Sequence, residues 1–394
     1  MAWNIFTTFA IFIKNIPISE MHIKSLYFKN SFLGWEIAPI EFEQLNLLVG
    51  LSGAGKTQIL RAIWHLRGIA LGKTMNDVEW KIVFSNEDMD FEWSGAFGSP
   101  DMGDERYPLR FEKILALPSG ESIERTEDGG IIMNIPASEF NQRAPKSVTG
   151  SGLLFILYED NHEFIGRAIR GFKKMVFRDH TLPQSDTKLE FYELRFRYDR
   201  NKYDTLTIDD LKKSGFTTME RLLIAKMNKL DVIQEISDRF KDVFPEVAEI
   251  RFNEIRTPGQ DKGHIEYQLK PKKSQKLVPH WNISSGMLRI LNYLIEAYLA
   301  NEDTVFLIDE FENSLGHNCL PFLAEDILNR SISQQFIMTS HHPDIINEFE
   351  MNSWLVISRS NGRIQNTRPE ALPLGRTKHV PYLALMNYFE TTSS

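Results

Sequence analysis

Cysteine is almost absent from this sequence, because Cys319 is the only one among 394 residues. A single cysteine excludes an intramolecular disulfide and a zinc site built from several cysteines. We therefore expect a reducing compartment and place the protein in the cytoplasm. Excess positive charge is lacking too, since 45 Lys and Arg against 53 Asp and Glu give a formal charge of −8. This balance argues against a surface that is basic all over, but it is compatible with a local basic patch.

Long hydrophobic runs are also missing. The apolar segment 1–16 is shorter than the ~20 residues of a membrane-spanning helix, and Asn4 and Lys14 interrupt it. It has no basic leader and no small-residue cleavage site, so a signal peptide is disfavoured. We expect a strand or a docking segment there or, if Met21 is the natural start, an extension upstream of it. The chain is thus expected to be soluble, with no membrane partner.

Internal repeats and sustained heptads are absent, which argues against a solenoid and against long coiled-coil arms. The composition is that of a globular protein, with 42% apolar and 25% charged residues, and the length allows two or three domains. Apolar and β-branched runs predict strands over 21–28, 45–49, 80–84, 130–135, 247–255, 264–269, 304–308, 335–339 and 354–358. Helical spacing, or long stretches with few Gly and Pro, predicts helices over 58–66, 153–175, 219–244, 286–300 and 321–328.

The segment Gly50–Thr57 matches the pattern G-x-x-x-x-G-K-[ST] at every fixed position, between a buried strand and a helix. Its glycines allow the backbone to wrap so that N–H groups and the helix N-terminus point at phosphate oxygens. Lys56 is expected to reach the β- and γ-phosphates, and the Thr57 hydroxyl to bind Mg²⁺. A glycine-rich turn with a chance lysine is the weaker alternative. The predicted nucleotide-binding residues here are Gly50, Ser52, Gly53, Ala54, Gly55, Lys56, Thr57 and Gln58.

A second motif consists of four apolar residues, Val305–Ile308, that run directly into Asp309 and Glu310. Such a strand places Asp309 at the carboxyl edge of a sheet, where α/β proteins bind ligands and where it can hold Mg²⁺ through water. Glu310 is the group expected to polarise the attacking water. On its own, a strand that ends in Asp-Glu is more often structural, so its meaning depends on the glycine-rich segment.

Ser284, Ser285 and Gly286 stand immediately before a predicted helix. Two interpretations are open. One is ordinary N-capping by a serine, which is the commoner use of such a sequence. The other is a second anion-binding helix N-terminus that meets a γ-phosphate held by another subunit.

The buried strand over 335–339 is followed by Ser340, His341 and His342. A histidine at that edge can hydrogen-bond a γ-phosphate or order the attacking water, and this is the role expected of His341. A metal site made by the two histidines is disfavoured. Adjacent residues of an extended segment point in opposite directions, and no Cys or further His lies nearby in the sequence.

Taken in order, these segments resemble the soluble ABC/SMC-like ATPases of the RecF, SMC and OLD type, especially the AAA-labelled bacterial ATPases of antiphage defence systems. The matching segments are Gly50–Thr57 as Walker A, Ser284–Gly286 as a shortened ABC signature, Val305–Glu310 as Walker B, Glu312–His317 as the D-loop region and His341 as the switch histidine. The resemblance implies an α/β fold, a P-loop NTPase with an ABC-type ATPase head and a mixed sheet.

The resemblance also implies a set of roles. ATP and Mg²⁺ are the implied cofactors, bound between two heads of a homodimer or higher homo-oligomer. The signature of one subunit would face the nucleotide of the other. The implied catalytic residues are Glu310, His341 and Lys56, the implied Mg²⁺ ligands are Thr57 and Asp309, and the implied signature contacts are Ser284, Ser285 and Gly286.

The sequence departs from that family in three places. The signature is short, and the D-loop carries Gly316-His317 where relatives often have His-Pro. The position of the Q-loop glutamine is the third difference: Gln142 is the candidate, and a solvated loop residue is an equal interpretation of it. Phe32 is the candidate for the aromatic that touches adenine.

The long interval between Thr57 and Ser284 leaves room for an inserted lobe, and it counts against a compact transporter subunit. We predict an ATPase head that begins over 21–150 with Walker A and a β-rich lobe. An inserted, mainly helical lobe follows over 151–245. The head then continues over 246–394 with the signature, Walker B and the switch histidine.

Two groups of basic residues are candidates for contact with DNA or RNA. A solvated helix face and a charged loop are the alternative, which the net charge slightly favours. The first group is Arg167, Arg170, Lys173, Lys174 and Arg178, and the second is Lys270, Lys272, Lys273 and Lys276.

The stretch after His341 is short and carries no nuclease motif, so we expect any effector to be a separate protein. The leading function is ATP hydrolysis at a dimer interface, in a sensor or scaffold for antiphage defence or nucleic-acid maintenance. The first alternative is a regulatory interaction protein that uses ATP as a structural ligand. A transporter ATPase subunit is the weaker one.

Overall fold

The computed structural model describes residues 21–99, 107–126, 131–134, 163–178, 193–194, 199–256, 263–313, 315–316, 319–372 and 385. Several sequence-based expectations lie outside these residues. They concern the segment 1–16, Gln142 and two D-loop positions, Ser314 and His317.

Five parallel strands form one end of a thirteen-stranded sheet in the described residues. In spatial order they are β16 (Trp354–Ser360), β3 (Leu45–Val49), β15 (Gln335–Thr339), β14 (Val305–Ile308) and β9 (Met175–Arg178). All residues of β14 and β15 are buried, as expected for parallel strands covered on both faces. The strands expected over 45–49, 304–308, 335–339 and 354–358 are confirmed.

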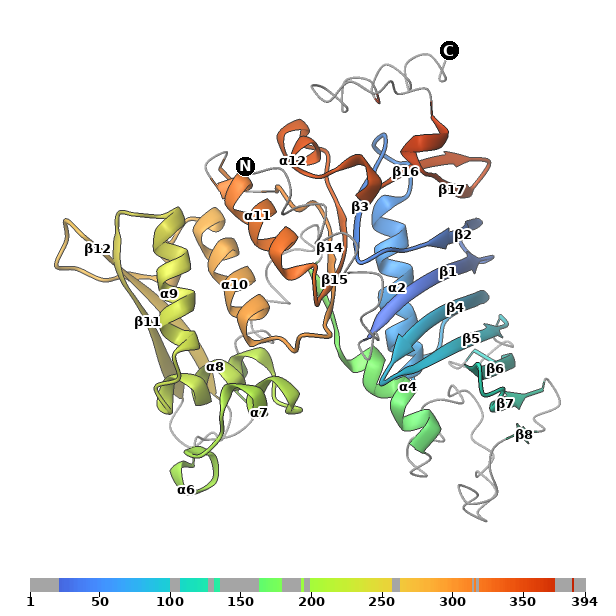
Figure 1. Cartoon of the computed structure of the whole chain (residues 1–394), viewed down its shortest axis with the longest axis horizontal. Helices are drawn as coiled ribbons and strands as arrows, with labels where there is room; N and C mark the ends of the chain where they lie inside the picture. The colour runs from blue at the N-terminus through green and yellow to red at the C-terminus, as the bar shows by residue number, and fades with distance from the viewer. Residues whose placement is uncertain are drawn as a thin grey trace, which may run out of the picture.

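The rest of this sheet is mostly antiparallel and extends to one end of the molecule (Figure 1). Next to β16 it continues with β17 (Arg363–Thr367), β2 (Trp35–Glu41), β1 (His22–Asn30), β4 (Val78–Asn86), β5 (Met89–Phe97), β6 (Leu109–Leu117), β7 (Ser122–Arg125) and β8 (Ile131–Asn134). The β-rich region predicted after Walker A is therefore confirmed for its described part.

Two hydrophobic cores lie on the two faces of this sheet. Because side chains alternate along a strand, Leu48 of β3 enters one core, whereas Leu47 and Val49 enter the other. The core that contains Leu48 also receives the helices α2 (Lys56–Ala70) and α4 (Glu163–Lys173). The opposite core receives α10 (Ser285–Leu299), α11 (Leu320–Arg330) and α12 (Pro343–Glu348).

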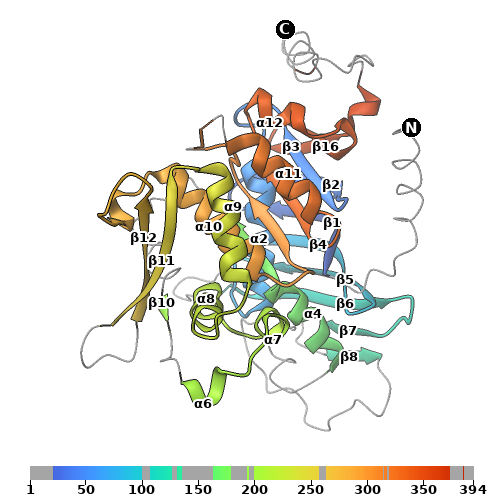
Figure 2. The same cartoon turned by 60° about the vertical axis from the view of Figure 1, so that its left-hand side comes forward.

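A second, smaller sheet lies at the other end of the molecule (Figure 2). It contains β10 (Glu193–Leu194), β12 (Gly263–Pro271), β11 (Val247–Arg256) and β13 (Val278–Pro279). The helices of this region are α6 (Arg200–Tyr203), α7 (Ile208–Lys213), α8 (Thr218–Met227) and α9 (Val232–Val243). Both α8 and α9 pack on α10, which joins this region to the core on one face of the large sheet.

Short 3₁₀ turns complete the description. They are η3 (His280–Asn282), η5 (Met351–Ser353) and η6 (Pro369–Ala371). None of the described helices is long and apolar enough to cross a membrane.

The helix predicted over 153–175 differs from the structure at its end. In the described part, α4 stops at Lys173, and Met175 begins β9, which pairs with β14 in parallel. Met175, Val176 and Phe177 can extend the buried sheet, which helical spacing alone does not reveal. Part of the segment 151–245 thus belongs to the large sheet, and the division into three regions stays a prediction.

Candidate functional site

The glycine-rich loop between β3 and α2 needs glycine at two positions for steric reasons. Gly50 has φ 154°, and a Cβ there would lie 2.3 Å from the Ile357 carbonyl oxygen. Gly55, the N-cap of α2, has φ 104°, and its Cβ would lie 2.5 Å from Cδ1 of Ile364. Only glycine adopts these conformations at such close approach. The loop therefore lies tightly against β16 and β17, at the N-terminus of a 15-residue helix.

Lys56 lies inside this loop. Its side chain is buried, and Nζ donates hydrogen bonds of 2.8 Å to the Gly50 carbonyl and 2.9 Å to the Leu51 carbonyl. Burial lowers the pKa of Lys56 to about 8, against the opposing attraction of nearby carboxylates, of which Asp309 is the strongest. The ammonium group is thus held by neutral carbonyls at the place where the motif expects phosphate oxygens.

Asp309 is fully buried at the carboxyl end of β14. Its Oδ1 accepts hydrogen bonds from the Thr57 hydroxyl at 3.0 Å and from the Thr339 hydroxyl at 2.8 Å. Its Oδ2 is buried and has no hydrogen-bond partner among the described residues. A buried, unsatisfied carboxylate oxygen is costly unless a cation or donor pairs with it. This oxygen and the adjacent Thr57 hydroxyl are hard ligands of the kind that Mg²⁺ prefers, so the residues fit the ion.

Glu310 follows with φ 46°, an unusual conformation for a residue other than glycine. Two contacts hold it there. Its backbone N–H donates to the Thr339 hydroxyl at 2.8 Å, and its Oε2 accepts from Nδ2 of Asn313 at 3.1 Å. The strained backbone therefore fixes the direction of a carboxylate beside Asp309, as functional sites often do.

His341 lies just beyond β15. Its backbone N–H donates to Oε1 of Glu312 at 2.6 Å. Desolvation and then the positive charge of Lys56 lower the pKa of its ring, which is therefore neutral at neutral pH. The ring of His342 has a different role, since Nδ1 accepts from the Asp344 N–H at 3.3 Å and caps α12.

Ser284 caps α10 as the simpler of the two interpretations requires. Its Oγ accepts from the Met287 N–H at 3.3 Å, and both Ser284 and Ser285 are exposed. Within the described part of the chain, none of Ser284, Ser285 and Gly286 forms a hydrogen bond to the glycine-rich loop. The structure therefore brings the Walker A, Walker B and switch residues together but leaves the signature serines at the surface.

Arg289 lies one turn into α10, close after the signature serines, and its charge interacts with carboxylates of the Walker B and D-loop segments. Burial lowers its pKa to about 10, and the negative charges of Glu312 and Glu310 oppose this shift. A positive charge near the start of α10 thus interacts with the carboxylates that follow β14. Arg289 was not predicted from the sequence.

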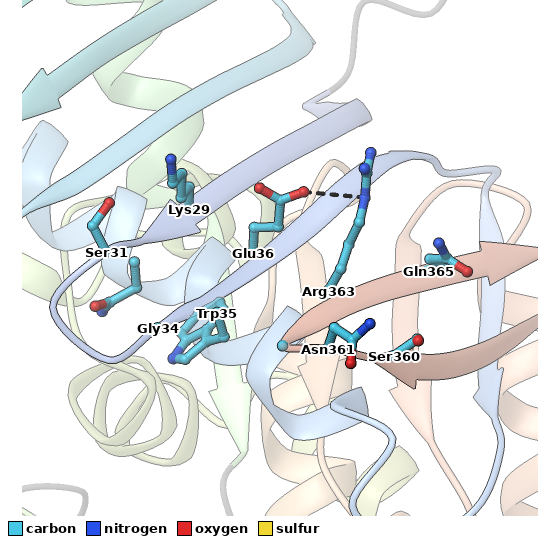
Figure 3. A pocket seen from close by; sticks show the side chains of 11 residues that line it. Lys29, Ser31, Gly34, Trp35, Glu36, Ser360, Asn361, Arg363 and Gln365 are labelled. Carbon is cyan, nitrogen blue, oxygen red and sulfur yellow. Dashed lines mark ion pairs between the residues drawn. The ribbon is translucent and has the colours of Figure 1, made fainter.

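A pocket of about 620 Å³ lies between the turns of two hairpins, β1–β2 and β16–β17 (Figure 3). An ion pair of 3.0 Å between Glu36 and Arg363 bridges the hairpins. The lining residues are Lys29, Asn30, Ser31, Gly34, Trp35, Glu36, Ser360, Asn361, Gly362, Arg363 and Gln365. Phe32 is 65% exposed and does not line the pocket, so its contact with adenine stays a prediction.

Thr339 is the main residue that sequence reasoning missed. Its hydroxyl connects Asp309 to the backbone of Glu310, and its carbonyl accepts from the Phe311 N–H at 3.0 Å. A usable signal was present, because a buried apolar strand ends in a hydroxyl residue two positions before the switch histidine. Parallel pairing of β14 and β15 brings the two strand ends together.

Comparisons with known proteins agree with this geometry. Residues 45–347 match the family model described as AAA domain, putative AbiEii toxin, Type IV TA system. Because this match spans most of the chain, the protein belongs to that family. Its α/β fold with a large mixed sheet is that of a P-loop NTPase, and the family match supports ATP binding and ATPase activity in general. A search of curated proteins gave no match.

Solved structures with a related shape include SMC head domains. The head bound to the C-winged helix domain of ScpA is 16% identical, with a TM-score of 0.49, and the match covers 88% of this chain and 97% of that one. The head from Thermotoga maritima is 13% identical, with a TM-score of 0.40 and coverage of 88% and 98%. These likenesses are too distant to carry a conclusion.

Proposed function

We propose that the protein hydrolyses Mg-ATP, with the phosphates on the loop Gly50–Thr57. The observation that carries this proposal is the buried Asp309, whose Oδ1 is shared by two hydroxyls and whose Oδ2 has no protein partner among the described residues. A site built for structure alone would satisfy that oxygen. Thr57 and Asp309 would hold Mg²⁺, which when bound neutralises charge on the phosphates.

The residues around the phosphates divide the chemical work. Lys56 exchanges its two carbonyl partners for phosphate oxygens, whose negative charge favours its protonated form. Glu310, fixed by Thr339 and Asn313, orients the attacking water and accepts its proton as the water oxygen bonds to the γ-phosphorus and the bond to ADP breaks. The neutral ring of His341 hydrogen-bonds the γ-phosphate or this water.

The signature half of the site comes from a second copy in this proposal. Ser284, Ser285 and Gly286 lie at the exposed N-terminus of the 15-residue helix α10. Such a terminus favours an anion, and none of the three forms a hydrogen bond to its own glycine-rich loop in the described residues. Two copies that each place this helix end on the other's γ-phosphate form a homodimer with two composite sites.

The test is the Glu310→Gln variant. It keeps the shape of the side chain and its contact with Asn313 but loses the proton acceptor, so the hydrolysis rate should fall at least ~100-fold. ATP binding should persist, and the variant should accumulate as an ATP-bound dimer in light scattering. Glu348→Gln, which changes an exposed glutamate after the switch segment, is the matched control and should hydrolyse ATP normally.

Two outcomes would contradict parts of this proposal. Unchanged hydrolysis by Glu310→Gln would remove that residue from the mechanism. Binding of ATP by the wild-type chain with no turnover would favour the alternative, a regulatory protein in which ATP is a structural ligand.

We also propose a cytoplasmic role in antiphage defence or nucleic-acid maintenance, with a separate effector protein. The support is the resemblance of the motif set and the family description, which names a putative toxin. A phage plating assay with this gene and its neighbour, together and singly, tests the pairing. Protection that needs only this chain would overturn the separate effector.

The ion pairs distinguish the two basic groups as candidate contacts for DNA or RNA. Arg170 pairs with Glu87 and Glu163, Lys174 with Asp303, and Arg178 with Glu296, so the first basic group is largely neutralised. Lys272, Lys273 and Lys276 form no ion pair within the described residues. We propose the second group as the nucleic-acid contact, with a salt-dependent affinity that charge reversal there abolishes.

A further inference from the structure

One tryptophan differs from the others that the structure describes. Trp80, Trp93 and Trp354 are fully buried, and Trp35 and Trp64 are partly buried, whereas Trp281 is 67% exposed. Its indole forms an edge-to-face contact with the His280 ring, with centroids 5.2 Å apart. An exposed indole of this size is typical of a contact that another molecule completes, because Trp is enriched among the residues that dominate interfaces.

The position of Trp281 connects it to the signature. It lies in η3, which ends at Asn282, directly before the buried Ile283 and the cap residue Ser284. Ile283 anchors this segment in the core, so the indole is held at the same end of α10 as the signature serines.

A second group of exposed apolar residues lies at the glycine-rich loop. Leu51, within the loop, is 40% exposed, and Phe32 and Leu33, in the β1–β2 turn, are 65% and 62% exposed. The β1–β2 hairpin and the loop both contact the β16–β17 hairpin. The Glu36 N–H donates to the Gly362 carbonyl at 3.1 Å, and Ile364 of β17 lies against Gly55. Each half of the proposed composite site therefore carries its own uncovered apolar surface.

We infer that Trp281 of one copy packs on the Leu51 rim of the second copy's glycine-rich loop when ATP brings the two together. This inference rests on the proposed dimer, which places the signature end of α10 over that loop. The two apolar surfaces then cover each other and exclude water around the phosphates. In a single copy Trp281 and Leu51 both stay exposed. Their contact therefore forms only when two copies build the composite site.

A nucleic-acid base is a less suitable occupant for Trp281. An acid lies beside η3, since Nδ1 of His280 lies 4.0 Å from Oε1 of Glu266. In the register of β12 with β13, Leu269 pairs with Val278, so Lys272 and Lys273 lie at the far turn of this hairpin. Lys272 lies six positions beyond Glu266, or about 20 Å along an extended chain, which places it far from the indole.

Cross-linking between copies tests the contact directly. In the Glu310→Gln background, tagged chains carrying Trp281→Cys are mixed with untagged chains carrying Leu51→Cys and exposed to a mild oxidant. ATP should produce a disulfide-linked heterodimer. The native Cys319 is buried, and it is common to both chains. Ile332→Cys replaces Trp281→Cys in the control, because Ile332 is 71% exposed but lies before the amino end of β15, opposite the loop.

The side-chain deletion gives an independent readout. Trp281→Ala in the same background should bind ATP as a monomer with unchanged affinity but dimerise roughly tenfold more weakly. Ile332→Ala should dimerise like the parent.

The outcomes separate this inference from the function it rests on. An ATP-dependent Trp281–Leu51 cross-link with a weakened Trp281→Ala dimer supports it. A normal ATP-dependent dimer that gives no cross-link and tolerates Trp281→Ala overturns it and leaves the proposed composite site intact. Absence of any ATP-dependent dimer overturns both.

Discussion

The Walker half and the signature half of the site differ in how complete they are within one chain. Lys56 and Asp309 are buried. Lys56 donates hydrogen bonds to carbonyls of its own loop, and Asp309 accepts hydrogen bonds from Thr57 and Thr339. Ser284 and Ser285 are exposed, and the cap bond of Ser284 stays within its own helix. The Walker half is thus organised before any ligand binds. The signature half is an exposed helix N-terminus, and in the proposed function it contacts a nucleotide bound by a second copy.

This difference follows from where each half lies in the fold. The Walker residues stand at the ends of β3, β14 and β15, which are neighbours in the parallel sheet, so packing brings their side chains together. The signature stands at the start of α10, where only the helix terminus is constrained. Packing of the fold therefore preorganises the first half, whereas the second half requires a surface from outside the chain.

The largest expected effect on stability comes from adding a side chain where the glycine-rich loop lies close to β16. Gly50→Ala should lower the free energy of unfolding by about 3 kcal/mol or more, because its Cβ would meet the Ile357 carbonyl oxygen at 2.3 Å. Gly53→Ala is the control, since φ is 80° but no described atom lies within 4 Å of its Cβ. It should cost about 1–2 kcal/mol for strain alone. Equal losses in urea unfolding would show that packing against β16 does not matter.

A smaller effect is expected when the connection between Asp309 and Glu310 is removed. Thr339→Val keeps the shape but deletes the hydroxyl, which should destabilise the fold by about 1–2 kcal/mol and lower the hydrolysis rate roughly tenfold. Thr339→Ser keeps the hydroxyl and should restore the rate. If Thr339→Ser is as slow as Thr339→Val, then methyl packing and not the hydrogen bonds positions the carboxylates.

The smallest effect on stability is expected in the signature half. Ser284→Ala removes one cap bond and should cost about 1 kcal/mol in thermal unfolding. ATP affinity of the separated copies should be unchanged, while ATP-dependent dimerisation falls. Ser214→Ala, which removes a hydroxyl bonded to the Leu211 carbonyl at the end of α7, is a control away from the site. If the monomeric Ser284→Ala chain binds ATP more weakly, then the signature half contributes to ATP binding within its own chain, and the difference between the two halves is wrong.

The sequence predicted the parallel strands β3, β14, β15 and β16 and the Walker segments, because buried parallel strands are continuous apolar runs that end in functional residues. It did not predict β9, since Met175–Arg178 follows a helix without a turn signal and is recognisable as a strand only by pairing with β14. Thr339 and Arg289 were missed for a similar reason. Their importance comes from neighbours that are distant in the sequence, and no local pattern records such contacts.

The alternation of side chains along β3 has a thermodynamic consequence. Leu48 belongs to one core, and Leu47 and Val49 belong to the other, so the strand that carries the nucleotide loop is held from both faces of the sheet. Partial unfolding of either core would therefore also dismantle the loop. By linkage, a nucleotide at 100 times its dissociation constant stabilises the native state by about 2.7 kcal/mol. That protection should slow hydrogen exchange in both cores together, including helices far from the phosphates.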